Sequence, residues 1–316
     1  MADPLVTIVI PTYNRADLLA ETLDSVSAQT FRDYEIIVVD DGSTDHTAQM
    51  IARRSEPIRY FRQRNEGASS ARNHGLREAR GSLVAFLDSD DLWLPEYLQA
   101  CVELLRQRDE LAMVYCDFTC IGETGQPVNG HRKVQHDGDV VERLFASTFV
   151  HTSCVTARKS VVLDAAGFDE SLPTNEDYDL WLRLALQYPF GLVSRVLCKR
   201  RTHRCSLSRN GRSGNLLRKT ALLEDFYHRY GDGRIGRRIA HRRLGKVHYS
   251  AGKSLLKDGC FHQARYLLQR SLHYRSIAPK TWALFLLSAT LAFADRSGNG
   301  SSRSSRVALY GPKSKQ

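Results

Sequence analysis

The sequence predicts an α/β fold with a mainly parallel sheet, because strand patterns and helix patterns alternate over about the first hundred residues. The strand patterns are short runs of β-branched and aromatic residues. Three of the four are almost wholly apolar, which is typical of strands covered on both faces. A chain of 316 residues with 42% apolar residues can bury the core that such a sheet needs.

The predicted helices and strands follow one another in order. The first helix covers residues 16–29, where leucine and valine recur at helical spacing. The second begins after Asp45, whose side chain suits an N-cap. The third covers residues 68–79 and ends before Gly81. The strands that these helices connect are residues 6–10, 34–40, 58–63 and 82–88.

Polar segments follow three of these strands. They are "PTYN" (11–14), "DDGSTD" (40–45) and "DSDD" (88–91). In open α/β sheets ligands bind beyond the carboxyl ends of the strands, so we expect the three segments to form one ligand site. The sequence contains neither GxGxxG nor a P-loop lysine motif, so neither a dinucleotide-binding site nor an ATPase site is indicated.

Three carboxylates lie within four positions in "DSDD". Like charges this close repel one another unless a cation lies among them. Asp88 and Asp90 are one residue apart after a buried strand, where both can turn toward a hard divalent cation such as Mn or Mg. The alternative is that Asp90 caps the helix that follows, because Pro95 is typical of a position close to a helix start. Asp91 would then lie nearer to that helix. Both hypotheses remain open at this point.

A second acidic group begins the amphipathic helix expected over residues 175–186. Glu176, Asp177 and Asp179 occupy its first turn, where the helix dipole favours anions. On this pattern alone, ordinary helix-end electrostatics is the better explanation. A carboxylate there can also act as a base when a substrate hydroxyl comes within hydrogen-bond reach.

Taken together, these segments resemble the family 2 glycosyltransferases of GT-A fold. The resemblance covers residues 5 to about 208 and is highly specific as a set, although each motif is weak alone. The matching motifs are "TIVIPTYNR", "IIVVDDGSTD", "NEGASSARNHGL", "FLDSDD", "GFDESL", "NEDYDLWLRL" and "RTHRCS". The resemblance implies a GT-A fold with a mixed, mainly parallel sheet. After residue 208 the match fades and the sequence becomes helical and arginine-rich, so we expect a C-terminal helical appendage there.

The resemblance implies that the polar segments hold the nucleotide of a nucleotide-diphosphate sugar donor. Pro11, Thr12 and Tyr13 would line the base and ribose pocket. Asp40 would accept a hydrogen bond from the base, with Asp41 beside it. The other residues implied to contact the donor are Arg72, Asp88, Ser89 and Arg201, the last of these through phosphate. For Arg72 the alternative is an ordinary solvated helix residue.

The resemblance also implies the chemistry. Asp88 and Asp90 match the DxD motif, whose Mn or Mg ion neutralises the diphosphate leaving group. His203 matches a position that can reach the metal or the pyrophosphate, although a lone histidine is often a surface residue. Asp177 matches the catalytic base, and Glu176 would position the acceptor or the helix.

The activity implied is therefore metal-dependent, inverting transfer of a sugar to a hydroxyl acceptor. The expected acceptor is a saccharide or glycolipid in surface polysaccharide or glycolipid assembly. We expect a catalytic domain over residues 1–210, a basic helical region over 211–294 and a disordered tail over 295–316.

The charge distribution supports this division. From residue 195 onward there are 27 Lys and Arg against 5 Asp and Glu, whereas the preceding residues are net acidic. Residues 245–279 predict a helix pair around Gly259, reminiscent of one tetratricopeptide unit.

The run 282–294 is apolar but shorter than the roughly 20 residues that a spanning helix needs. It predicts either a buried helix beside a solvated basic face or peripheral contact with an anionic membrane.

Other functions are less consistent with the sequence. The basic region would support nucleic-acid binding electrostatically, but it lacks RRM, KH and zinc-finger patterns. A non-catalytic nucleotide-sugar binder is the alternative, although both carboxylates of the DxD and both residues of the ED pair are present. A nucleotidyltransferase shares the metal chemistry but not the order of motifs. The seven cysteines form no CxxC pair, and the N-terminus lacks a secretory signal, so we expect a cytoplasmic protein.

Overall fold

The computed structural model describes residues 3–128, 136–202, 212–231 and 233–297. The chain divides into two compact units, residues 1–207 and residues 208–316.

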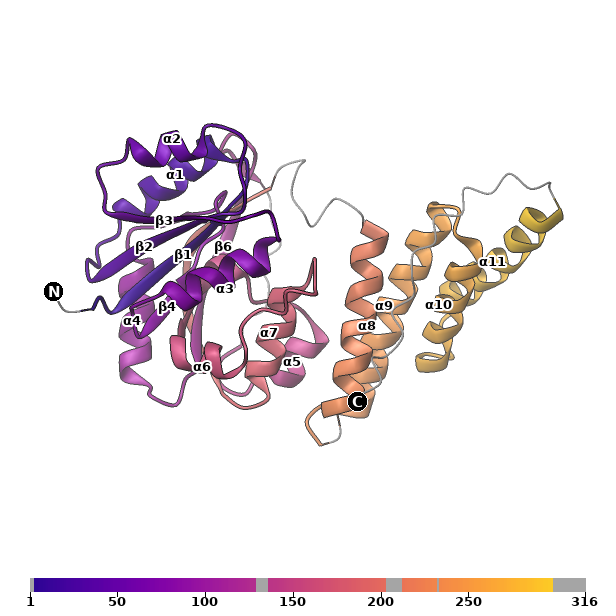
Figure 1. Ribbon diagram of the computed structural model, residues 1–316. Helices are drawn as coiled ribbons and strands as arrows, with labels where there is room; N and C mark the ends of the chain where they lie inside the picture. Colours follow the sequence, from indigo (N-terminus) through magenta and orange to yellow (C-terminus); the bar gives the residue numbers. More distant parts are fainter. Residues whose placement is uncertain (1–2, 129–135, 203–211, 232, 298–316) are drawn as a thin grey trace, which may run out of the picture. The chain divides into compact units, whose positions relative to one another are not determined.

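In the described part of the first unit, nine strands form one mixed sheet in the order β3-β2-β1-β4-β8-β6-β9-β5, with β7 paired to β6 (Figure 1). The half that carries β1 to β4 is parallel, and β8 joins it antiparallel to β4. All four predicted strands are present. The strands are β1 (Val6–Thr12), β2 (Tyr34–Asp40), β3 (Ile58–Arg62), β4 (Leu83–Phe86), β5 (Leu92–Trp93), β6 (Met113–Ile121), β7 (Pro127–Val128), β8 (Val155–Arg158) and β9 (Phe190–Arg201).

Helices cover both faces of this sheet. The helices of the first unit are α1 (Ala16–Ser27), α2 (Thr47–Ala52), α3 (Ala68–Glu78), α4 (Tyr97–Gln107), α5 (Val141–Ala146), α6 (Lys159–Asp164) and α7 (Glu176–Ala185), with a 3₁₀ turn η1 (Thr152–Cys154). Leu19 and Leu23 of α1 share a core with Ile8 of β1 and with Val102 of α4. On the opposite face, α3 lies along β1 and β2 (Figure 1).

The α3 face carries the elements that later form the site. Gly75 lets α3 approach β1 closely, because a Cβ atom there would lie 2.4 Å from Val9 Cγ1. Phe86 of β4 meets Phe168 edge-on, with ring centroids 5.1 Å apart. Phe168 in turn contacts Trp181 of α7 with a centroid separation of 6.0 Å. This aromatic cluster fixes the start of α7 near the end of β4.

Two expected helix caps differ from the structure. Strand β5 follows Asp91 directly and pairs with β9, and α4 begins only at Tyr97 with Glu96 at its N-cap. The predicted capping role of Asp90 is therefore wrong, since the chain needs β5 to complete the sheet before it turns into a helix. At α2 the N-cap position belongs to His46, but Asp45 Oδ1 still accepts the Thr47 backbone N–H at 3.0 Å.

The second unit is helical in its described residues. It contains α8 (Arg212–Tyr230), α9 (Arg237–Lys257), α10 (Phe261–Tyr274) and α11 (Pro279–Ser297). The predicted helix pair is present as α9 and α10, and Gly259 between them has a φ of 76°, which favours glycine. Helix α11 continues past the expected boundary at residue 295 because its helical hydrogen bonding runs on to Ser297. Residues 298–316 of the predicted tail lie outside the described residues.

A polar network joins α8, α9 and α10. Glu224 of α8 accepts hydrogen bonds from Arg270 (2.6 Å) and from the Tyr274 hydroxyl (3.0 Å), and it lies 3.2 Å from His248 Nε2. Burial by itself raises the pKa of Glu224. The hydrogen bonds and charges of His248 and Arg270 outweigh burial and lower that pKa to about 2.

Replacing Glu224 with glutamine should therefore reduce the free energy of unfolding by about 2 kcal/mol at neutral pH, since it removes charge-assisted hydrogen bonds. A carboxylate whose pKa is lowered on folding stabilises the fold above its unfolded pKa. That stability is lost as pH falls from the ordinary value of 4.5 toward about 2. Urea unfolding at several pH values measures this. The difference in free energy of unfolding between wild type and Glu224→Gln should become smaller as pH falls from 4.5 toward about 2.

The matched control is Asp225→Asn on the same helix, where the carboxylate also pairs with an arginine but is exposed. Equal losses for the two variants would contradict the role given to Glu224.

Candidate active site

The polar segments that follow the strands meet at one edge of the sheet, as predicted. Thr12 ends β1 directly opposite Asp40, which ends β2. Asn14 has a φ of 51° and joins the two segments, since its Oδ1 accepts the Thr44 N–H at 2.7 Å and its own N–H donates to Ser43 Oγ at 2.9 Å. Asparagine tolerates this left-handed conformation better than most residues do. The first two loops therefore form one preorganised surface.

Asp40 lies buried in this surface. One carboxylate oxygen accepts the Ser43 N–H at 2.7 Å, and the other accepts the Tyr60 hydroxyl at 2.5 Å. Burial, followed by this hydrogen bond, raises the pKa of Tyr60 well above its usual value. Beside Asp40, the buried hydroxyl of Thr12 has no hydrogen-bond partner among the described residues. Buried polar groups normally have a partner, so this hydroxyl is available to bind a ligand.

The neighbouring predicted residues have different surroundings. Pro11 is buried within β1, and Tyr13 is exposed just beyond the strand. Asp41 holds the start of α3: its carboxylate accepts the backbone N–H groups of Glu66 (2.9 Å) and Gly67 (2.8 Å), together with the Gln63 amide. Asp41 thereby fixes the helix that carries Arg72.

Arg72 connects the two acidic groups of the site. Its guanidinium donates to Asp88 Oδ1 at 2.6 Å and to Glu176 Oε1 at 2.8 Å, and its side chain is only 6% exposed. The guanidinium also lies over the Phe168 ring, 5.4 Å from the centroid. Burial lowers the pKa of Arg72, but Asp88 and Glu176 outweigh this and raise it. The alternative hypothesis of a solvated helix residue is therefore wrong for Arg72.

The three carboxylates of "DSDD" have three different environments. Asp88 pairs with Arg72, and although burial raises the pKa of Asp88, the Arg72 charge lowers it overall. Asp90 pairs with Arg15 at 2.8 Å. Asp91 is buried and accepts the Ser153 hydroxyl and the Arg201 N–H, while burial and the charges of Asp90 and Asp88 raise its pKa well above the usual range. Ser89 is buried between them.

Arg201 supports this segment from behind. Its side chain is 1% exposed, and each guanidinium nitrogen donates within the protein, to the Asp90 carbonyl, the Glu123 carbonyl and the Glu21 carboxylate. In this arrangement Arg201 positions the "DSDD" loop, because all three of its guanidinium nitrogens donate to groups of the protein. Its contact with phosphate stays a prediction. His203 lies outside the described residues.

The acidic start of α7 completes the site. Asp177 Oδ2 accepts the Thr152 hydroxyl at 3.0 Å, and Oδ1 accepts the Tyr178 N–H at 2.7 Å. For Glu176, burial and the Asp177 charge raise the pKa despite the Arg72 ion pair. Asn175 at the N-cap has a φ of 65°, so the chain turns sharply before the two carboxylates.

Sequence reasoning missed several residues that hold this site in place. Arg15 lies inside a quoted motif, and its position next to a polar loop was the available signal. Phe168 likewise lies inside a quoted motif, "GFDESL". Tyr60, Thr152 and Ser153 gave no signal, because they reach the site from segments outside the quoted motifs.

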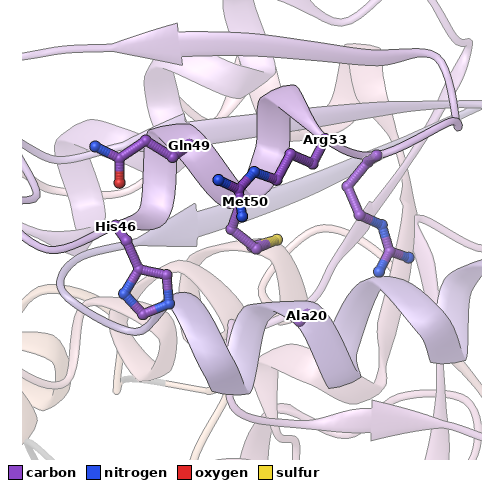
Figure 2. Close-up of a pocket in the computed structure, with 6 residues that line it drawn as sticks. Ala20, His46, Gln49, Met50 and Arg53 are labelled. Atoms are coloured by element: carbon purple, nitrogen blue, oxygen red, sulfur yellow. The ribbon is translucent and has the colours of Figure 1, made fainter.

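A cavity of about 500 Å³ lies elsewhere, between α1 and α2 (Figure 2). None of the predicted site residues lines it. Its lining residues are Ala20, His46, Gln49, Met50, Arg53 and Arg54.

The carboxylates of Asp88 and Asp90 fit a hard divalent cation. Within the described ranges, no group of three or more His, Cys, Asp or Glu side chains is placed to hold a metal ion. Two carboxylates leave most coordination positions to water or phosphate oxygens, which is how proteins usually bind Mg²⁺ with a nucleotide. In the structure Arg72 and Arg15 supply the positive charge beside these two carboxylates.

Comparison with known proteins identifies the family. The model of glycosyl transferase family 2 matches residues 7–164, half of the chain. An uncharacterized glycosyltransferase of Rickettsia typhi is 33% identical over 208 residues, which are 63% of this chain and 64% of that protein. The chondroitin synthase of Escherichia coli is 32% identical over 205 residues, 63% of this chain and 29% of the synthase. The chain thus spans less than two thirds of the length of both relatives.

Solved structures share the fold. S. aureus TarS 1–349 in complex with UDP-GlcNAc has a TM-score of 0.68 at 18% identity, covering 96% of this chain and 93% of that one. The mannosyltransferase PcManGT of Pyrobaculum calidifontis, in complex with GDP-Man and Mn²⁺, has a TM-score of 0.57 at 21% identity, covering 93% of this chain and 81% of that one. The predicted GT-A fold with C-terminal helices is confirmed. With the family model matching half of its length, the chain belongs to glycosyl transferase family 2.

Proposed function

We propose that this chain is a metal-dependent, inverting glycosyltransferase that moves a sugar from a nucleotide-diphosphate sugar to a hydroxyl acceptor. The observation that carries the proposal is that Arg72 pairs with Asp88 and with Glu176 at the same time. It thereby joins the "DSDD" segment to the acidic start of α7. A donor-binding group and a candidate base thereby belong to one site. Residues 1–210 are the proposed catalytic domain and residues 211–294 the basic helical region.

The donor would bind over the first two loops. Asp40 and Thr12 face each other there, and the Thr12 hydroxyl still needs a partner. Pro11, Tyr13 and Asp41 complete the proposed nucleotide pocket. UDP-GlcNAc and GDP-Man bound to similar folds support a nucleotide-diphosphate sugar as the donor class.

Asp88 and Asp90 would hold a Mn or Mg ion, and His203 remains a proposed third ligand. When bound, such an ion neutralises charge on the diphosphate as the sugar bond breaks. Arg72 and Arg15 bind the same two carboxylates, so they orient these side chains before the donor arrives. Arg201 fixes the backbone of the loop.

Asp177 would remove the proton from the acceptor hydroxyl as that oxygen attacks the anomeric carbon. The Thr152 hydroxyl and the Tyr178 N–H orient its carboxylate. Attack opposite the leaving group inverts the anomeric configuration. Chondroitin synthase among the relatives supports a saccharide acceptor, in polysaccharide or glycolipid assembly.

A thermal-shift screen against UDP, GDP, dTDP and CMP sugars, each with and without Mn or Mg, tests the proposal. We expect stabilisation by one nucleotide family that requires the metal, and a ligand at 100 times its dissociation constant adds about 2.7 kcal/mol. The variant Asp90→Ala should lose the metal requirement together with most of the shift.

Asp109→Ala is the control, because Asp109 is almost fully exposed and its surface ion pair contributes little. Absence of a shift with every donor, or an unchanged metal-dependent shift in Asp90→Ala, would contradict the proposed donor site.

A further inference from the structure

Helix α11 turns its small side chains inward and its large ones outward. The buried residues on its inner face include Thr281, Ser288 and Ala292. On the outer face, Leu286 is 61% exposed and Leu287 is 47% exposed. A surface helix of a globular protein normally buries its large apolar residues and shows polar ones to solvent.

The apolar face is larger than these two leucines. Trp282 is 46% exposed one turn earlier, and Phe293 is also exposed two turns later. Ile277, in the turn that joins α10 to α11, is 91% exposed. We call Ile277, Trp282, Leu286, Leu287 and Phe293 the α11 face. Contiguous exposed apolar residues of this kind mark an interaction surface.

The charges near the α11 face in the sequence are mostly positive, and Asp295 near the end of α11 is the exception. Residues 259–294 contain no Asp or Glu, whereas Arg265, Arg275 and Lys280 are exposed. Arg275 and Lys280 flank Ile277 in the sequence, so the apolar turn carries positive charge on both sides. The partner of this surface should therefore be both apolar and anionic.

We propose that the α11 face docks on the surface of an anionic lipid bilayer, with α11 lying in the interface. Large apolar residues, a tryptophan and flanking basic residues are the composition of interfacial helices. Among the described helices none is long and apolar enough to cross a membrane. A second copy of the chain fits the face less well, because two basic surfaces would repel each other. The proposal does not depend on the catalytic role of the first unit.

Flotation of the full chain with vesicles tests the proposal. The chain should bind phosphatidylcholine vesicles that contain phosphatidylglycerol, and high salt or pure phosphatidylcholine should weaken binding. Leu286→Ser with Leu287→Ser should lower the partition coefficient by about tenfold or more. Arg275→Gln with Lys280→Gln should lower it by about 30-fold, at roughly fivefold for each charge removed.

Matched controls lie on the first unit. Leu163→Ser with Val196→Ser removes two apolar side chains of similar exposure, and Arg106→Gln removes one exposed charge. These variants should bind vesicles as wild type does. The proposal is overturned if wild type does not bind anionic vesicles, or if the Leu163 and Val196 changes weaken binding as much as the Leu286 and Leu287 changes do. A concentration-dependent dimer that the Leu286 and Leu287 changes abolish, without vesicle binding, would instead assign the face to a second copy.

Discussion

Asp177→Asn is expected to lower kcat by about 10²- to 10⁴-fold, the usual contribution of a general base. Asparagine has nearly the same shape. Its single oxygen can still accept the Tyr178 N–H, and its NH2 group can donate to the Thr152 hydroxyl oxygen, so the start of α7 should keep its conformation. Its amide cannot accept the acceptor's proton. Steady-state kinetics with the donor found by the thermal-shift screen measures the loss, and NMR of the wild-type product checks for an inverted anomer.

Donor binding separates a lost base from a damaged site. The thermal shift given by the donor should be unchanged in Asp177→Asn, because the proposed donor contacts lie on other segments. Asp179→Asn is the matched control in the same helical turn, where the carboxylate pairs with Arg183. If Asp177→Asn keeps full activity, or if both variants lose activity equally, Asp177 is not the base.

The sheet and its polar edge could be predicted because their signals are local. Apolar runs predict β1, β2 and β4. The polar segments that follow parallel strands lie at the carboxyl edge of the sheet, where ligands bind. The capping role considered for Asp90 is wrong for the opposite reason. Strand β5 has only two residues and exists because β9, a hundred residues later, pairs with it. No local pattern in the sequence could reveal that pairing.

The two arginines expected at phosphate illustrate the same limit within the site. A motif match identified Arg72 and Arg201 alike as donor contacts. The structure places Arg72 between Asp88 and Glu176, whereas Arg201 is buried against Glu21, 180 residues away in sequence. Whether an arginine faces a ligand or supports a loop depends on tertiary packing, which a motif does not specify. Tertiary packing also brings Thr152 to the site, where its hydroxyl orients the carboxylate of the proposed base Asp177.

The charge network around Arg72 should also dominate the stability of the first unit. Arg72→Met removes the cation shared by Asp88 and Glu176 and leaves both carboxylates largely buried without a partner. Breaking a buried ion pair in this way typically costs about 3–5 kcal/mol. Chemical unfolding at neutral pH should show a loss of that size. Arg108→Met is the control, because Arg108 also pairs with two carboxylates, Asp137 and Glu110, but at the surface, where the expected loss is below about 1 kcal/mol.

A double-mutant cycle distinguishes this network from lost packing on Phe168. Arg72→Met leaves two carboxylates without their arginine, and Glu176→Gln removes the charge of one of them. The double variant Arg72→Met with Glu176→Gln should therefore lose about 1–3 kcal/mol less stability than the sum of the two single losses. The difference in free energy of unfolding between wild type and Arg72→Met should also become smaller at acidic pH. Arg72 lowers the pKa of Asp88, so the stability from this pair is present above the ordinary value of 3.8 and is lost as pH falls below it. Additive losses, or a loss no larger than that of Arg108→Met, would mean that Arg72 acts through packing and does not hold the two acidic groups together.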